Sequence, residues 1–379
     1  MKRKKVLRQG YTTGTCAAIA AKAAALMAVN HCVIQDEKRT DEVYRESIIV
    51  PKGLKISADI HDIKKENHKV SCAVRKDAGD DPDVTNGILI YAQVELIKEK
   101  QIMIDGGIGV GTVTKAGLPQ KIGEAAINPV PKKMIEQEVR NVLEDNGYFG
   151  GAKVIISVPE GENIAKKTFN PRLGIVNGIS ILGTSGIVEP MSEQALIDTI
   201  SVEMKMAWAN GIKNIIITPG NYGEDFIRDK LCLDLSQAVK CSNFVGESID
   251  LAVDIGFDSI LMIGHIGKFV KLAAGIMNTH SHQADGRMEV FTAHAAVAGA
   301  PIEVVKEIME CISTDEAVNI LTESGFLKST MEGILKKIEF HLRQRCVDEI
   351  PIGAVLFSNV YGILGMTSQA EQLLKRRER

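Results

Sequence analysis

The chain has 379 residues, and its 45 Lys and Arg against 48 Asp and Glu give a formal net charge of −3. This length predicts two domains, long enough to bury their cores without disulfides. The near-neutral charge and an aromatic content of 4% argue against a nucleic-acid-binding protein, which needs a basic surface or stacking aromatic rings. Glycine is in excess, with 34 residues, so the places where glycines cluster are informative.

The seven cysteines are scattered and form no C-x-x-C pair, so we expect neither a disulfide framework nor a zinc site. Scattered thiols are typical of the reducing cytoplasm. The alanine-rich run 17–29 is similar to part of a signal peptide, but a polar segment separates it from the basic N-terminus and Lys22 interrupts it. The longest uncharged stretch, 173–188, is too short and too polar to span a membrane. We therefore expect a cytoplasmic protein without membrane attachment.

The first part of the chain predicts helices mixed with antiparallel strands. Alternating apolar residues predict strands, and apolar residues at helical spacing predict helices. The expected helices are 12–30 and 132–145, and the expected strands are 47–50, 55–63, 70–74, 88–97 and 154–158. We expect residues 1–150 to form an α+β domain with a mixed or antiparallel sheet.

From about residue 191 the pattern alternates between apolar strands and helices. The expected strands are 214–218, 241–245, 259–263 and 354–357, with helices at 192–210, 247–255, 302–312 and 329–345 and one that begins at 268. This alternation predicts a parallel sheet with helices on its faces. We expect residues 151–379 to form an α/β domain whose ligands bind beyond the carboxyl ends of the strands.

One glycine motif, Asp105-Gly106-Gly107-Ile108-Gly109-Val110-Gly111, matches an acidic-x-Gly-x-Gly-x-Gly pattern. It is similar to the first motif of common S-adenosylmethionine-dependent methyltransferases, in which glycine lets the backbone approach a nucleotide-like ligand. Here no helix is expected after the motif, so we do not expect a standard Rossmann fingerprint. A glycine-rich hairpin or bulge and a non-standard ligand loop both stay open. The candidate cofactor-binding residues of this motif are Asp105, Gly107, Gly109 and Gly111.

The histidines are unevenly distributed, because His265, His280, His282 and His294 lie within 30 residues of one another. Histidine is suited to proton transfer near neutral pH, and His-x-His with a nearby Asp could instead ligate a metal. A loop whose histidines cap helices is the third interpretation. We take His265, His280 and His282 as candidate catalytic residues and expect no metal site.

Two further glycine turns, 219–223 and 264–267, each follow a strand and begin a helix. A helix N-terminus at such a place can bind a carboxylate or a phosphate. Gly220 and Asn221 are therefore candidate cofactor-binding residues, and Lys268 is a candidate anion-binding residue. Three more cations, Lys166, Lys167 and Arg172, flank another glycine-rich region, where a solvated surface cluster is the alternative interpretation.

Several longer segments of the sequence are unusual in composition and occur in order along nearly the whole chain. They are GYTTGTCAA at 10–18, DGG at 105–107 with the residues through 117, GEAAINPVP at 123–131, TFNPRLGI at 168–175, GTSGIVEPM at 183–191, PGNYG at 219–223, and residues 264–271 and 279–286. In these segments the chain resembles the CbiD family, the cobalt-precorrin-5B (C1)-methyltransferases of anaerobic cobalamin biosynthesis.

The resemblance implies transfer of a methyl group from S-adenosylmethionine to C-1 of cobalt-precorrin-5B, which gives cobalt-precorrin-6A, with cobalt present only as part of the substrate. It also implies a fold unlike the other methyltransferases of that pathway. Because the substrate carries many carboxylates, hydroxyl and cationic side chains in the matching segments are candidates for binding it. The candidate substrate-binding residues are Thr12, Thr13, Lys166, Lys167, Arg172, Thr184, Ser185, Lys268 and Arg287.

The expected partner is thus a small molecule, with no nucleic acid and no membrane, and a homo-oligomer stays open. Two alternatives also stay open: a non-catalytic tetrapyrrole-binding protein and a nucleotide-linked α/β enzyme. The second alternative predicts a G-x-G-x-x-G motif with an acidic residue about 20 positions further on, which the sequence lacks.

Overall fold

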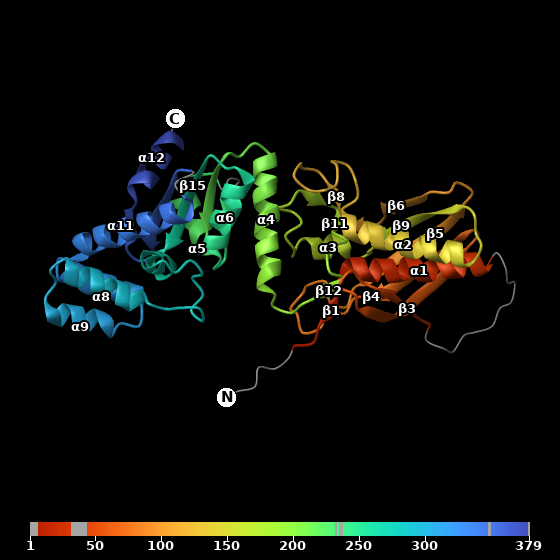
Figure 1. Cartoon of the computed structure of the whole chain (residues 1–379), viewed down its shortest axis with the longest axis horizontal. Coiled ribbons are helices and arrows are strands. Elements are labelled where there is room, and N and C mark those ends of the chain that lie inside the picture. Colours follow the sequence, from red (N-terminus) through yellow and green to blue (C-terminus); the bar gives the residue numbers. More distant parts are fainter. Residues whose placement is uncertain (1–6, 32–43, 232, 235–237, 348–349, 378–379) are drawn as a thin grey trace. The chain divides into compact units, whose positions relative to one another are not determined.

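The computed structural model describes residues 7–31, 44–231, 233–234, 238–347 and 350–377, so Cys32 and Cys232 lie outside the described residues. The chain forms two compact units, Met1–Ser192 and Glu193–Arg379 (Figure 1). The predicted boundary at 150/151 is wrong, because β9 (Gly151–Ser157) pairs with strands on both sides inside the sheet of the first unit. A boundary there would divide that sheet.

The first unit is built on a six-stranded mixed sheet of strand order β2-β3-β4-β5-β9-β6. All neighbouring strands are antiparallel except β6 and β9, which are parallel, and this confirms the predicted mixed sheet. Besides β9, the strands are β2 (Arg45–Ile49), β3 (Lys55–Glu66), β4 (Lys69–Arg75), β5 (Leu89–Ile97) and β6 (Ile102–Gly106). The helices are α1 (Thr13–His31), α2 (Pro129–Asp145) and the short α3 (Gly161–Ala165).

Helix α1 is the core helix of this unit. It packs against α2 and against β4 and β5 (Figure 1). Its alanines are almost all fully buried. Small side chains let the helix lie close to the strands, and the Cys72 Sγ is 3.2 Å from the Ala20 carbonyl oxygen. Thr13–Asn30 is long and apolar enough to cross a membrane, but 78% of that window is buried inside the protein. The apolar surface of α1 therefore faces the protein core.

The rest of the first unit is a lobe of short strand pairs, which we call the glycine lobe, residues 105–128 and 170–188. Its strands are β7 (Gly109–Val110), β8 (Thr112–Val113), β10 (Ile175–Val176), β11 (Gly178–Ile179) and β12 (Ile187–Val188), and β12 pairs with β1 (Gly10–Tyr11). Strand β7 is parallel to β11, and β8 is antiparallel to β10. As predicted, the strand that carries Asp105 leads into further short strands and not into a helix.

The glycines of this lobe allow one segment of backbone to lie directly against another. A Cβ on Gly109 would lie 1.7 Å from the Val158 carbonyl oxygen, and one on Gly178 would lie 2.3 Å from the Gly109 carbonyl oxygen. Gly109 also has φ of +73°, in the left-handed region that side chains with a Cβ rarely adopt. Glycine is therefore required here by the packing of the protein on itself.

The second unit has a five-stranded sheet of order β14-β13-β15-β16-β17. Its strands are β13 (Asn214–Thr218), β14 (Ala238–Lys240), β15 (Ser259–His265), β16 (Ile352–Ser358) and β17 (Gly362–Met366). Its helices are α4 (Glu193–Ala209), α5 (Asn221–Asp229), α6 (Val245–Ile255), α7 (Ile266–Phe269), α8 (Arg287–Val297), α9 (Ile302–Met309), α10 (Thr314–Glu323), α11 (Leu327–Arg345) and α12 (Ser368–Arg377), with a 3₁₀ helix at Val270–Ala274.

The predicted parallel sheet is confirmed for β14, β13, β15 and β16, and β17 adds an antiparallel edge strand that the sequence did not indicate. The strand predicted at 241–245 is wrong, because the parallel pairing with β13 ends at Lys240 and the chain then turns, with the Phe244 N–H bonded to the Cys241 carbonyl. Helices cover both faces of the sheet. Side chains of α4, α6 and α8–α11 pack on one face, and those of α5 and α12 pack on the other.

We predict that Gly109→Ala destabilises the first unit far more than Gly147→Ala does. Gly147 has a similar φ of +68°, but a Cβ there would meet nothing within 4 Å. Both variants incur left-handed strain of about 1–2 kcal/mol, whereas only Gly109→Ala also forces the backbone apart, at about 1–3 kcal/mol more. Urea denaturation followed by far-UV circular dichroism measures both, and equal losses would contradict the packing argument.

Candidate functional site

The parallel sheet of the second unit has a topological switch point between β13 and β15. The chain passes from β13 to β14 on one side of it, and then from β14 across to β15 on the other side. This order, 2-1-3-4 in chain sequence, is the doubly wound order in which ligands bind beyond the carboxyl ends of the first and third strands. Of the two glycine turns that the sequence singled out, 219–223 follows β13, and 264–267 spans the end of β15 and the start of α7. We call this place the carboxyl edge.

The β13 side of the carboxyl edge carries a small polar cluster. The Lys240 Nζ lies 2.7 Å from the Asn221 Oδ1 and 2.7 Å from the Glu224 Oε2, so it joins the end of β14 to the first turn of α5. The Thr218 side chain is fully buried at the end of β13, and its hydroxyl has no hydrogen-bond partner. Gly220 is the N-cap of α5, and a Cβ on it would meet nothing within 4 Å. The backbone at Gly220 therefore faces open space.

On the β15 side, His265 is the N-cap of α7. Its Nδ1 accepts the Gly267 N–H at 3.1 Å, so the neutral ring carries its proton on Nε2. Burial lowers the pKa of His265, and the nearby Asp315 carboxylate opposes this shift only in part. At neutral pH His265 is thus a hydrogen-bond donor through Nε2. The predicted role of this residue as a base is disfavoured by that arrangement.

The loop 278–286 is fixed to the carboxyl edge by a buried lysine. Lys271 is 3% exposed, and its Nζ donates to the Thr279 and Ala284 carbonyl oxygens at 3.2 and 2.8 Å. Burial lowers the pKa of Lys271. The Thr279 N–H donates to the Asn243 carbonyl at 2.9 Å, in the segment that follows β14. The sequence placed this loop between two helices, and the structure ties it to the ends of the strands.

The two histidines of that loop are exposed and lie together. The His280 Nδ1 accepts the His282 N–H at 3.1 Å, and the ring centroids are 5.1 Å apart. The His280 ring, like that of His265, is therefore fixed as an Nε2 donor when neutral. Arg287 forms a bidentate pair with Asp285 at 2.6 and 3.0 Å, which lowers the pKa of that carboxyl. In the described parts of the chain, no group of three or more His, Cys, Asp or Glu is placed to hold a metal ion.

Lys268 is the other cation of this edge. Its Nζ lies 3.5 Å from the Ser242 carbonyl oxygen, and burial lowers the pKa of its amine. The Cys241 thiol next to it is buried, which raises its pKa to about 12. A thiol with so high a pKa is a poor nucleophile at neutral pH.

In the first unit, the predicted hydroxyl residues at the start of α1 are occupied within the protein. The Thr12 Oγ1 accepts the Thr15 N–H at 3.2 Å, and the Thr13 Oγ1 accepts the Leu182 N–H at 2.8 Å. Both residues are buried. Ser185 bonds to the Ile187 backbone, whereas Thr184 is exposed. The Thr12 N–H donates to the Gly186 carbonyl oxygen at 3.2 Å, so Thr12 and Thr13 fasten the loop 182–186 over the helix N-terminus.

The predicted cofactor residues of the glycine lobe are also used by the protein itself. A Cβ on Gly107 would lie 2.3 Å from the Ser157 Oγ, and one on Gly111 would lie 2.3 Å from the Ile175 Cγ2. Asp105 is exposed, and its Oδ1 accepts the N–H of its neighbour Gly106. Of the interpretations the sequence left open, the packing favours the structural one, a glycine-rich hairpin or bulge, over a ligand loop.

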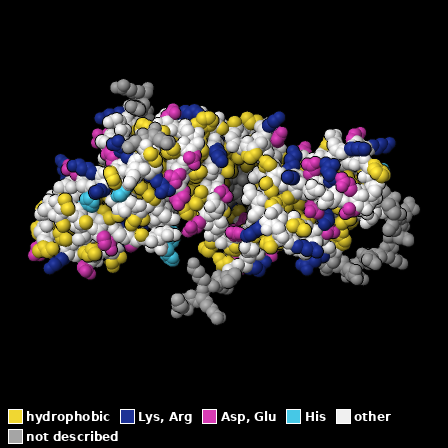
Figure 2. Space-filling model, in the orientation of Figure 1, with side chains coloured by type: hydrophobic (Ala, Val, Ile, Leu, Met, Phe, Trp, Pro, Cys, Tyr) yellow, Lys and Arg dark blue, Asp and Glu magenta, His cyan; other side chains and the backbone are white. Residues whose placement is uncertain are grey.

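The predicted cations of the first unit are Lys166, Lys167 and Arg172, and all three are exposed. They flank the buried Asn170, whose Nδ2 donates to the Gly178 carbonyl at 3.2 Å and so holds this loop on the glycine lobe. Exposed apolar side chains occur in and beside the same lobe, among them Ile108, Ile122, Phe169, Val176 and Leu182. On the face drawn in Figure 2, basic and acidic side chains are interspersed over much of the surface.

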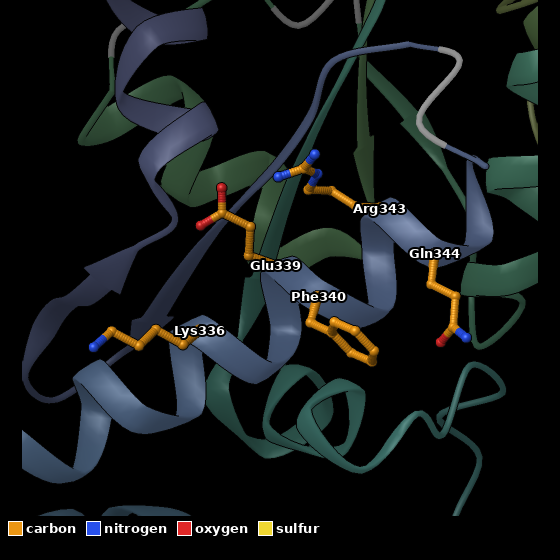
Figure 3. A pocket seen from close by; sticks show the side chains of 5 residues that line it. All are labelled: Lys336, Glu339, Phe340, Arg343 and Gln344. Carbon is orange, nitrogen blue, oxygen red and sulfur yellow. The ribbon is translucent and has the colours of Figure 1, made fainter.

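Two surface grooves of the second unit lie away from the carboxyl edge. One, of about 500 Å³, is lined by five side chains of α11 alone, with Glu339 and Arg343 toward one side and Phe340 and Gln344 toward the other (Figure 3). Glu339 is already bonded to the Ser368 hydroxyl at 2.5 Å. The other, of about 630 Å³, runs along the outer strand β17. Neither groove contains a predicted site residue, so we locate the site by the chemistry at the strand ends.

The sequence reasoning singled out the segment 219–225, which contains Tyr222 and Glu224, but it missed Thr218 and Lys240 at the same edge. The position of Thr218 at the end of the predicted strand 214–218 could have indicated that residue. The end of β14 could not be found in that way, since the strand itself was predicted a few residues too late.

Family comparisons agree with the division into two units. The family model described as CbiD matches residues 1–190, and the model described as CbiD, C-terminal domain, matches residues 278–368. The architecture is thus that of a two-unit α/β protein whose second unit has a mainly parallel sheet. This chain belongs to the CbiD family.

Its relatives are similar over almost their whole length. A protein of Ruminiclostridium cellulolyticum is 51% identical, over 95% of this chain and 91% of that protein. A protein of Clostridioides difficile is 39% identical, over 98% and 97% respectively, and one of Salmonella arizonae is 41% identical, over 98% and 95%. All three are named cobalt-precorrin-5B C(1)-methyltransferase. A crystal structure of the cobalamin biosynthesis protein cbiD from Archaeoglobus fulgidus is 29% identical, covers 74% of this chain and 84% of that one, and has a TM-score of 0.38.

We predict that the second unit loses stability as the pH falls below about 6.5, and that His265→Asn reduces this loss. Because the pKa of His265 is lowered on folding, the unfolded chain binds a proton that the folded chain does not, from the ordinary value of about 6.5 downward. Asparagine keeps an acceptor for the Gly267 N–H but does not titrate.

Trp208 on α4 is the one tryptophan of the chain, so its fluorescence during urea denaturation reports on the second unit. We expect the difference in unfolding free energy between pH 7.5 and 5.5 to be smaller in the variant, with a residual part from His294, whose pKa burial also lowers. An identical pH dependence in both proteins would contradict the prediction.

Proposed function

We propose that this protein is a cobalt-precorrin-5B C(1)-methyltransferase that uses S-adenosylmethionine as the methyl donor. The observation that supports this most is the identity of 39–51% with proteins of that name over nearly the whole chain. The reaction breaks the bond between the methyl carbon and the sulfonium sulfur, whose electron pair stays on the sulfur. The ring carbon C-1 supplies the electron pair of the new carbon–carbon bond.

Such a displacement needs alignment of donor and acceptor more than a nucleophilic side chain. Well-oriented reacting groups reach effective molarities of about 10⁵–10⁸ M. Among the described residues, the buried thiols of Cys16, Cys72 and Cys241 are poor nucleophiles, because burial raises their pKa to about 12. We therefore assign the protein the tasks of binding, orienting and proton handling.

The carboxylates of the corrinoid precursor are proposed to bind to cations that solvent can reach. Lys166, Lys167 and Arg172 are exposed on the first unit, and Lys268 and Arg287 are partly exposed on the second. Arg287 is paired with Asp285, so only the guanidinium N–H groups that do not bond to this carboxylate can bind the substrate. Thr184 and Ser185 are proposed substrate contacts, with Thr12 and Thr13 acting through the loop that they hold.

His282 is the best proposed base. Its ring packs edge to face on His280, whereas the rings of His265 and His280 each use Nδ1 to accept a backbone N–H. A neutral His282 can therefore accept a proton that the macrocycle releases, and His280 orients its backbone. The loop that carries both rings is held to the carboxyl edge by Lys271.

The decisive experiment incubates the full chain with cobalt-precorrin-5B and ¹³C-methyl-labelled S-adenosylmethionine. We expect one labelled methyl, assigned to C-1 by NMR, and one equivalent of S-adenosylhomocysteine. Corrinoid binding without labelled product would favour the tetrapyrrole-binding alternative. Product that carries the label at another carbon would overturn the proposed position.

We predict that the His280→Ala, His282→Ala double variant lowers kcat by about 100-fold or more, as expected for the loss of general base catalysis. The acidic limb of the pH–rate profile should disappear as well, which a merely structural role would not cause. His68→Ala, an exposed histidine in the turn between β3 and β4, is the matched control. Wild-type kcat and pH profile in the double variant would eliminate the base role.

A further inference from the structure

The carboxyl edge, between the loops that follow β13 and β15, has the features of a nucleoside site. We infer that it binds the methyl donor S-adenosylmethionine, and that the glycine motif at 105–111 does not. This inference rests on the proposed function and gives its donor a place. It is drawn from an unpaired buried hydroxyl, an open helix N-terminus and an exposed aromatic ring that meet at the switch point.

The buried hydroxyl belongs to Thr218, which is 0% exposed and has no partner for its Oγ1. That oxygen lies under the first turn of α5, where a Cβ on Gly223 would be only 1.6 Å from it. A buried polar atom without a partner destabilises the folded protein, so its presence at a ligand edge calls for a polar group that pairs with it in the bound state. Because Gly223 has no Cβ, the hydroxyl can lie directly against the first turn of the helix.

The N-terminus of α5 is accessible as well as polar. Beside Gly220, where an added Cβ would meet no atom within 4 Å, the first amides of the helix favour an electron-rich group. Asn221 and Glu224 present an amide and a carboxylate held by Lys240 at 2.7 Å, and these can bond to the hydroxyls of a ribose. The polar features match a sugar better than a macrocycle.

The aromatic ring of Tyr222 also lies at the carboxyl edge. Tyr222 is 68% exposed on the first turn of α5, which is unusual for a ring that serves only packing. Exposed aromatic rings are platforms on which purines stack. On the β15 side, the His265 Nε2–H is a hydrogen-bond donor for the carboxylate of a methionine-like tail. Purine, diol and carboxylate are the three groups that S-adenosylmethionine combines.

The glycine motif of the first unit lacks the corresponding space. Backbone or side-chain atoms of the protein lie within 2.3 Å of the Cβ positions of Gly107, Gly109 and Gly111. Their lack of side chains is therefore used in packing, whereas Asp105 in the same motif remains exposed. Because Asp105 is exposed, a substitution there can test whether the glycine motif, and not the carboxyl edge, binds the methyl donor.

Isothermal titration calorimetry of the full chain with S-adenosylmethionine and with S-adenosylhomocysteine tests the inference. We expect Tyr222→Ala to weaken binding roughly tenfold or more, as for loss of a base-stacking ring. Thr218→Val should also weaken binding several-fold, while its urea midpoint, followed by Trp208 fluorescence, stays equal or rises because the unpaired hydroxyl is gone. Tyr44→Ala, in the first unit, is the aromatic control and should bind as wild type does.

Asp105→Asn discriminates between the two loops. Unchanged affinity in this variant, together with weakened binding in Tyr222→Ala and Thr218→Val, supports the carboxyl edge. Weakened binding in Asp105→Asn with wild-type affinity in the other two overturns the inference and leaves the proposed function intact. If wild-type protein binds neither compound, with or without the corrinoid, both the inference and the proposed methyl transfer fall.

Discussion

The parallel pairing of β13 with β15 is the constraint on which the candidate site depends. Asn214 lies opposite Ser259 and Ile217 opposite Met262, so both strands run to the same edge of the sheet, where β15 extends two residues beyond the end of β13. Because β14 lies on the outer side of β13, the helices that follow the two paired strands leave in different directions. The glycine turns at 219–223 and 264–267 therefore lie at the same edge of the sheet because β13 and β15 are neighbouring parallel strands. The bonds from Lys271 then bring a third segment, the loop 278–286, to the same edge.

Glycine has opposite roles in the two units. In the glycine lobe, Gly109 and Gly178 remove the side chains that would keep two segments of backbone apart, and the space is filled by the protein. At the carboxyl edge, Gly220 leaves a helix N-terminus open, and Gly223 makes room for the hydroxyl of Thr218. A glycine excess in the sequence thus combines folding requirements with ligand requirements. Whether a given glycine serves folding or ligand binding is indicated by the protein atoms that surround its Cβ position.

The sequence predicted the elements better than it predicted their contacts. Hydrophobic periodicity located α1, α2, β13 and the long helix α11, since local pattern decides where such elements form. It misplaced β14, a strand of three residues, and it omitted β17, whose antiparallel pairing with β16 depends on tertiary context. It also selected Gly109 as a candidate cofactor-binding residue, a position where the packing of the protein requires glycine. Whether a glycine faces protein or ligand is decided by segments distant in sequence, here Val158.

An unpaired hydroxyl is not in itself evidence of a ligand site, as a second threonine shows. Thr330 is also fully buried, and its Oγ1 also lacks a partner, but it lies inside α11 among the apolar side chains of the core. Thr218 differs in its surroundings and not in its burial. It ends a strand at the switch point, and the neighbouring helix begins at Gly220, where the space is open. The proposed ligand at that opening would therefore lie beside Thr218, whereas no such opening is found at Thr330, whose unpaired hydroxyl has only the core around it.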